Sequence, residues 1–77
     1  MSEEKVYTGE VIWFRVDWGF GFLRWEIDGV KQTDMFAHFS DIAFEGFKLL
    51  KADQKVSFSI GLNNDGEEKA INIQVID

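Results

Sequence analysis

Apolar and polar residues alternate along most of this chain with a period of two, the pattern of β-strands that bury one face. Turn signals interrupt the alternation at Asp28-Gly29 and at residues 63–66, where Asn-Asn-Asp-Gly stands. No segment shows the roughly 3.6-residue period of a long helix, and the chain contains no proline. We therefore predict an all-β protein with strands at residues 5–15, 18–26, 34–38, 55–60 and 70–75.

We expect these five strands to close into a small antiparallel barrel, because closure removes exposed sheet edges. The inward positions carry the small or aliphatic side chains that so small an interior needs. The predicted core residues are Val11, Gly21, Leu23, Met35, Ala37, Val56, Phe58, Ile60, Ile71, Ile73 and Val75. Gly9, inside the first strand, predicts a bend or bulge there. We also predict a single helical turn at residues 40–42 and a long connection over residues 43–53.

Several large aromatic rings remain after this core is filled. Trp18, Phe20 and Phe22 occupy alternate positions with only glycine between them, so they are expected on one face of a strand. Trp13 and Phe36 are expected on the same outer surface. An exposed apolar surface usually marks an interaction site, and a row of rings suits planar ligands such as nucleic-acid bases.

The length and charge of the chain refine this picture. Its 77 residues allow one small domain, which we place over residues 1–77 with residues 1–4 as a frayed end. The net charge is −6, but the acidic excess lies near the two ends. Residues 11–62 hold every Phe and Trp and contain seven acidic and six basic residues, Arg15 and Arg24 among them. A binding site in this region would rely on stacking more than on phosphate neutralisation.

Other classes of function find no support in the sequence. The lack of cysteine excludes disulfides and thiolate metal sites and fits a reducing cytoplasm, where we expect the protein. No apolar run reaches the roughly 20 residues of a membrane span, and the acidic N-terminus is unlike a secretory signal, so we expect no membrane partner. One histidine predicts no metal site, and no nucleophile–base pair predicts a catalytic site. We expect a non-enzymatic protein without a cofactor.

Four segments, in this order, resemble the cold shock domain. They are residues 9–14 (Gly-Glu-Val-Ile-Trp-Phe), 19–22 (Gly-Phe-Gly-Phe), 34–40 (Asp-Met-Phe-Ala-His-Phe-Ser) and 46–48 (Gly-Phe-Lys). The second segment and the centre of the third are similar to the two ribonucleoprotein motifs of that family. The resemblance covers about residues 6–76 and implies a five-stranded OB-fold barrel that binds single-stranded DNA or RNA.

The resemblance also implies which residues contact nucleic acid. The residues at the family's base-stacking positions are Trp13, Phe20, Phe22, Phe36, His38, Phe39 and Phe47. Phe14 matches a further aromatic contact, and Asp34 matches a residue that hydrogen-bonds a base edge. Trp18 stands where a lysine is usual and would add a stacking surface. Structural alternatives stay open: partial burial for Phe14 and Phe39, an ordinary structural role for His38, and a turn contact for Asp34.

Three regions depart from the family pattern. Ile12 and Trp18 replace two usual lysines, residues 67–70 read Glu-Glu-Lys-Ala where Gly-Pro-Gln-Ala is usual, and the loop over residues 26–33 is longer than in compact bacterial members. These departures reduce the expected share of phosphate contacts in binding.

The predicted function is therefore single-stranded nucleic-acid binding by stacking, as an RNA chaperone or a regulator of transcription or translation, with the protein a monomer. The alternative is a protein-interaction module that uses the same apolar face, with a homodimer as one form of it.

Overall fold

The computed structural model describes residues 5–43 and 50–76, which form an antiparallel sheet of six strands and one 3₁₀ turn. The elements are β1 (Tyr7–Arg15), β2 (Phe20–Ile27), β3 (Val30–Lys31), β4 (Met35–His38), η1 (Phe39–Asp41), β5 (Lys55–Leu62) and β6 (Glu68–Val75). The strand order is β3-β2-β1-β5-β6, and β4 also pairs with β2. The predicted all-β fold is confirmed. No helix among the described residues has the length and hydrophobicity that crossing a membrane requires.

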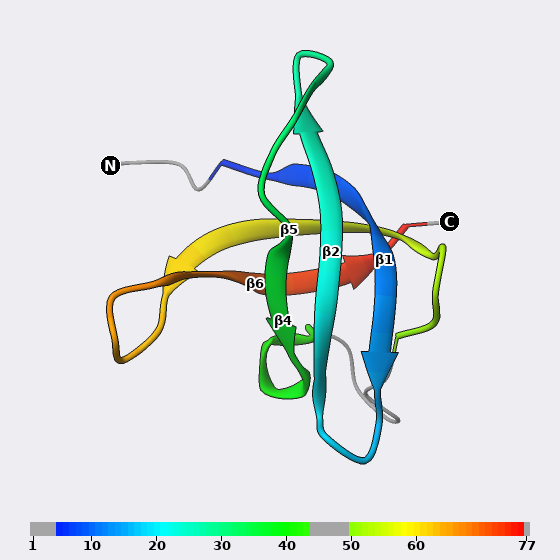
Figure 1. The fold of residues 1–77 in the computed structure, drawn as a ribbon, viewed down its shortest axis with the longest axis vertical. Helices are drawn as coiled ribbons and strands as arrows, with labels where there is room; N and C mark the ends of the chain where they lie inside the picture. The colour runs from blue at the N-terminus through cyan, green and yellow to red at the C-terminus, as the bar shows by residue number, and fades with distance from the viewer. Residues whose placement is uncertain (1–4, 44–49, 77) are drawn as a thin grey trace.

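The sheet folds over itself into a small OB-type barrel (Figure 1). β1, β2 and β4 form the front layer, and β5 and β6 cross behind them. β1 joins the two layers, because residues 7–10 pair with β5 while residues 9–15 pair with β2. On the other side, Ile42 forms a parallel bridge with Ile73, and the Ala43 N–H donates to the Ile73 carbonyl at 2.8 Å. This contact brings the segment after β4 against β6.

The core lies between the two layers and largely matches the inward positions predicted from alternation. Its buried hydrophobic residues are Val11, Leu23, Trp25, Met35, Ala37, Ile42, Leu50, Val56, Phe58, Ala70 and Ile73. Ile60 and Val75 pack against this core but stay partly exposed, and Ile71 is also partly exposed. The period-two pattern therefore predicts more fully buried residues in β5 and β6 than the structure has.

Trp25 is part of the core rather than of the outer surface, with only 7% of its area exposed. Its indole N–H donates to the Thr33 carbonyl at 2.8 Å, so burial leaves no polar group of the ring unpaired. Tyr7 and Phe58 meet the indole in edge-on contacts at 5.0 and 5.6 Å between ring centroids. This aromatic cluster is separate from the outward row of rings.

A β-bulge in β1 decides which of its side chains face inward. Val11 lies opposite Leu23, but Trp13 lies opposite Phe22, so Ile12 is one extra residue in β1. The bulge reverses the alternation of the strand. As a result Val11 is buried while Trp13, two residues later, is exposed on the outer face.

A second bulge lies in β6. Ile71 is opposite Ser59 and Gln74 is opposite Ser57, so β6 has one residue more than β5 over this stretch. Asn72 has a φ of 52°, a left-handed conformation that asparagine tolerates better than most residues. The bulge explains why the simple alternation predicted for residues 70–75 is wrong in part.

Two predictions about the first hairpin need correction. A bend or bulge was predicted at Gly9, and the bulge is wrong in position, since Gly9 keeps regular partners on both sides and the extra residue is Ile12. Gly9 does lie where β1 passes from its pairing with β5 to its pairing with β2. The second strand begins at Phe20, not at Trp18, because residues 16–19 form a turn. Gly19 closes that turn with a φ of 79°, and its N–H donates to the Arg15 carbonyl at 2.7 Å.

The region over residues 26–33 is largely a hairpin extension rather than an open loop. Asp28 and Gly29 have φ values of 51° and 82°, as a two-residue type I′ turn requires. Ile27 then pairs with Val30, which adds the short strand β3 that the sequence did not predict. The predicted turn at residues 63–66 is confirmed. The helical turn begins one residue earlier than predicted, as η1.

Some predictions fall outside the described residues. These are the frayed end at residues 1–4 and the predicted site residue Phe47, which lies within residues 44–49.

Candidate functional site

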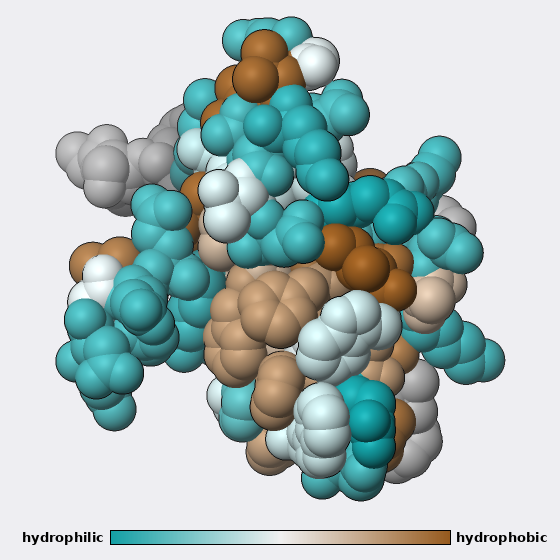
Figure 2. All heavy atoms as spheres, in the orientation of Figure 1, coloured by the Kyte–Doolittle hydropathy of each residue, from teal (hydrophilic) through white to brown (hydrophobic). Residues whose placement is uncertain are grey.

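Seven aromatic rings form one continuous group on the outer side of β1, β2 and β4, which we call the aromatic platform. Its members are Trp13, Trp18, Phe20, Phe22, Phe36, His38 and Phe39. Their contacts link all seven rings, with centroid separations between 4.7 and 6.4 Å. Figure 2 shows apolar surface gathered over the lower half of these strands, with hydrophilic surface above it.

The pairing of β2 with β4 assembles the centre of the platform. Phe20 lies opposite His38, and Phe22 lies opposite Phe36. The Phe36 ring is 5.4 Å from that of Phe20 and 5.8 Å from that of Phe22. The intervening Gly21 faces the interior, as strand alternation requires. The predicted outward placement of these rings is confirmed.

Trp13 joins the platform because the bulge at Ile12 turns it outward. Its ring lies 5.4 Å from Phe22 and 5.9 Å from Phe20. Gly21 permits this geometry, because a Cβ at that position would collide with the backbone carbonyl of Trp13. Glycine is needed here for the close approach of two backbones rather than for an unusual φ.

Trp18 reaches the platform from the turn before β2. Its ring is nearly parallel to that of Phe20, at 26° and 5.6 Å, and meets Trp13 edge-on at 6.2 Å. More than half of the surface of the residue, 55%, is exposed. The turn also touches η1, since the Phe39 N–H donates to the Gly19 carbonyl at 2.9 Å. The predicted neighbourhood of Trp18 and Phe20 is thus present, although a turn and not a strand produces it.

η1 positions the last two rings. The His38 Nδ1 accepts a hydrogen bond from the Ser40 N–H at 3.2 Å, which caps the 3₁₀ turn. Nδ1 also lies 2.8 Å from the Ser40 hydroxyl oxygen, so Ser40 holds the ring through two contacts. The rings of His38 and Phe39 lie 4.7 Å apart. An ion pair of 3.1 Å between Asp41 and Lys69 ties the turn to β6.

Three predicted site residues are not part of this group. Phe14 lies opposite Gly21 and packs against the core, on the inner side of β1. Asp34 is exposed and directly precedes β4. Phe47 lies outside the described residues. Their roles as nucleic-acid contacts stay predictions from the family resemblance.

Arg15 brings a positive charge to the platform, a contact that the residue pattern does not predict. Its guanidinium carbon lies 4.0 Å from the centroid of the Trp18 ring. Its Nε and Nη2 donate to the two carboxylate oxygens of Asp17 at 3.1 and 2.8 Å. These hydrogen bonds hold the pKa of Asp17 below its ordinary value of 3.8. The only signal in the sequence is that the three residues stand close together around the predicted turn.

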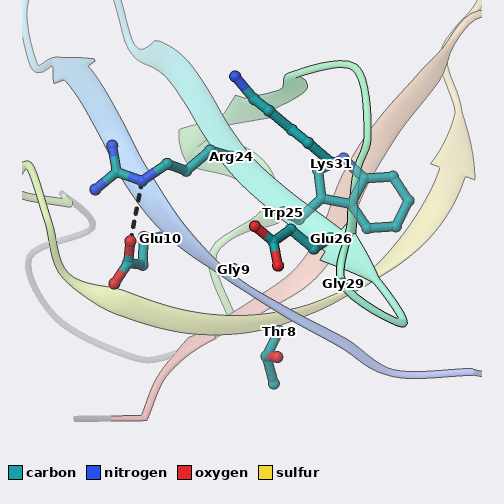
Figure 3. Close-up of a pocket in the computed structure, with 8 residues that line it drawn as sticks. All are labelled: Thr8, Gly9, Glu10, Arg24, Trp25, Glu26, Gly29 and Lys31. Carbon is teal, nitrogen blue, oxygen red and sulfur yellow. Dashed lines mark hydrogen bonds and ion pairs between the residues drawn. The ribbon is translucent and has the colours of Figure 1, made fainter.

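The other end of β1 and β2 carries charges on the same outer face. A hollow of about 550 Å³ lies there, lined by Thr8, Gly9, Glu10, Arg24, Trp25, Glu26, Gly29 and Lys31 (Figure 3). Arg24 donates to Asp53 and to Glu10, each at 2.9 Å, and these bonds raise the pKa of its guanidinium. Within residues 5–43 and 50–76, no group of three or more His, Asp or Glu side chains is placed to hold a metal ion.

The sequence was compared with families of known proteins, and the result agrees with the order of its motifs and with its barrel fold. The family described as "'Cold-shock' DNA-binding domain" matches residues 7–76. The chain belongs to the cold-shock domain family. The predicted family resemblance is thereby confirmed over almost the whole chain.

Individual cold-shock relatives match over most of their own length. The cold shock-like protein CspA of Bordetella pertussis is 42% identical over 69 residues, which cover 90% of this chain and 97% of the relative. The major cold shock protein CspA of Bacillus cereus is 48% identical over 61 residues, which cover 79% and 85%. The cold shock-like protein of Aquifex aeolicus is 40% identical over 70 residues, which cover 91% and 94%. The family description and these names refer to no enzymatic activity.

Proposed function

We propose that the aromatic platform binds single-stranded DNA or RNA by stacking unpaired bases on its rings. The observation that carries this proposal is the unbroken contact chain of seven rings on one outer face. Each stacked base contributes about 1–3 kcal/mol, whatever its identity, because every base has a flat face. Several such contacts give useful affinity without many cations. Membership of the cold-shock domain family supports the same function.

The cellular role that fits this chemistry is an RNA chaperone. Stacking is tolerant of sequence, and only unpaired bases expose their faces to the platform. Binding therefore favours the open form of a weak hairpin and draws strands apart by mass action. Regulation of transcription or translation would use the same contacts. Phe14, Asp34 and Phe47 belong to this proposal only through the resemblance.

A fluorescence titration tests the proposal. An oligothymidine or oligouridine of about seven nucleotides is added at low salt while tryptophan emission is followed. Trp13 and Trp18 lie in the platform and should be quenched, whereas Trp25 is buried and serves as an internal reference. W13F and W18F should each remove part of the quenching. A folded protein whose emission does not change with any homopolymer would overturn the proposal.

A second candidate function is a protein-interaction surface. The observation behind it is the exposure of Trp13 (36%), Trp18 (55%) and Phe39 (47%) on one face. Sedimentation over a range of protein concentrations separates the two functions. A monomer that binds oligonucleotide argues against self-association, and a dimer that dissociates when oligothymidine is added means that both ligands use one face. A dimer that survives saturation with oligothymidine means that the dimer contact lies elsewhere.

A further inference from the structure

The turn between β1 and β2 holds a cation against the aromatic platform. Arg15 is the last residue of β1 and lies opposite Phe20, the first residue of β2. Trp18 folds back over this pair, so that its ring contacts both the Phe20 ring and the Arg15 guanidinium. Lys5 lies over Tyr7, away from the platform. Among the described residues, Arg15 is the one Lys or Arg whose charge lies over a platform ring.

Asp17 occupies part of the hydrogen-bonding capacity of Arg15. The paired bonds of 3.1 and 2.8 Å use two of the five N–H donors of the guanidinium. The side chains of Arg15 and Asp17 are 48% and 63% exposed, so water screens their attraction. Exposed ion pairs of this kind contribute little to stability. A ligand can therefore replace the carboxylate at small cost if it offers equivalent oxygen atoms.

A phosphodiester offers such atoms. Its two free oxygens carry negative charge and match the forked geometry of a guanidinium, as a carboxylate does. A strand whose bases stack on Trp18 and Phe20 brings its backbone phosphates close to Arg15, because the guanidinium lies over the Trp18 ring and Arg15 pairs with Phe20 across the hairpin. We propose that Arg15 is the phosphate-binding residue of the platform and that Asp17 is an exchangeable internal competitor for it. This inference rests on the proposed function, since it needs a nucleic-acid strand on the rings.

The proposal explains how one end of the site keeps a cation although Trp18 replaces a lysine. Trp18 holds the guanidinium in place by a cation–π contact, and Asp17 reduces its attraction for phosphate until a stacked strand arrives. A phosphate that binds without stacked bases therefore gains little binding free energy, whereas a strand whose bases also stack gains both the ring contacts and the contact with Arg15. Asp17 would in this way favour stacked strands over nonspecific binding of anions.

The test compares binding of the same oligothymidine to wild type, R15Q, D17N and the R15Q/D17N double variant at several salt concentrations. For single strands each phosphate contact contributes about 0.7 to the slope of log affinity against log salt. We expect D17N to steepen the slope by up to this amount, which is about a fivefold gain in affinity for each tenfold fall in salt. R15Q should flatten the slope, and R15K should largely preserve it.

Two controls separate this effect from general electrostatics. D17N also removes a negative charge, so D28N removes the same charge from the exposed hairpin turn at the far end of β2. D28N should leave the slope unchanged, and D17N should have little effect in the R15Q background. An R15Q slope equal to wild type, or an equal effect of D17N with and without Arg15, would overturn the inference. Either result leaves the proposed function standing, whereas wild type that binds no oligonucleotide removes both.

Discussion

The two ends of the β1–β2 hairpin share one outer face but present opposite chemistry. Toward the turn at residues 16–19 the outward side chains of β2 are Phe20 and Phe22, within the aromatic platform. Toward the turn at Asp28-Gly29, at the other end of β2, the outward side chains are Arg24 and Glu26, beside the hollow of Figure 3. The same strand alternation exposes both sets. The backbone thus supplies one surface, and residue type alone divides it into two regions.

The division has an energetic consequence for ligands. Most rings of the platform meet edge-on or at a tilt, so parts of their faces stay exposed to water, and covering them with a base is favourable. Arg24 at the other end already bonds to Asp53 and Glu10. The one aromatic residue that lines the hollow, Trp25, is only 7% exposed, so a base would gain little stacking there. We therefore expect binding at the platform and a solvated surface at the hollow.

The strongest test of this contrast is the removal of two rings. F20A combined with F36A should lower oligothymidine affinity by about 1–3 kcal/mol for each ring and leave the fold intact, because both rings point outward. Binding is measured by fluorescence titration, and the fold by circular dichroism. T8A, a truncation at the hollow, is the matched control and should bind as wild type does. Equal losses from T8A and from the ring variant would contradict the division.

A smaller effect is expected from G21A, which acts on the support of the platform. A Cβ at this position collides with the Trp13 backbone, so the strands must separate or the bulge must shift. We expect a loss of about 3 kcal/mol in the free energy of unfolding, measured by urea denaturation. G29A is the control, since its Cβ meets no atom within 4 Å and only its φ of 82° is unfavourable. G29A should lower the free energy of unfolding by about 1 kcal/mol. Equal costs would mean that the close approach at Gly21 is unimportant.

The salt dependence of binding sharpens the same comparison. A site that relies on rings, with one cation already paired to Asp17, should show a shallow slope of log affinity against log salt, of about 0.7 or less in magnitude. Titrations from about 20 to about 200 mM salt measure it. A slope several times steeper, typical of a strongly basic binder, would show that charge rather than stacking dominates.

The smallest expected effect is the titration of Asp17. Its pKa is lowered from 3.8 by the hydrogen bonds from Arg15, so the folded state binds this proton less readily than the unfolded chain. The resulting stabilisation is present above about pH 4 and is lost as the pH falls through the lowered pKa. NMR titration of the carboxyl carbon should show this shift. In R15Q the pKa should return toward its ordinary value, and an unchanged titration would contradict the assigned cause.

The outer row of rings on β2 and β4 was predictable because alternation is a local property. Phe20, Phe22 and Phe36 each stand next to inward-facing residues, and both strands keep that alternation. The tight turn at Asp28-Gly29 was equally predictable, since both residues tolerate the positive φ that it requires. The outward rings of the candidate site could therefore be placed from sequence on two strands.

Trp13 and Trp18 lie on the outer surface as predicted, but local patterns do not contain the bulge and the turn that place them there. A bulge is defined by an extra residue relative to a partner strand, so the outward turn of Trp13 exists only once β1 is paired with β2. Trp18 joins the platform because a turn folds back over Arg15 and Phe20, not because it continues a strand. The sequence by itself determined the five longer strands to within a few residues, the turns at Asp28-Gly29 and residues 63–66, and the central rings. Only the tertiary structure decided how the rings contact one another and where the cation of the platform lies, because both depend on contacts between segments whose alignment no single segment specifies.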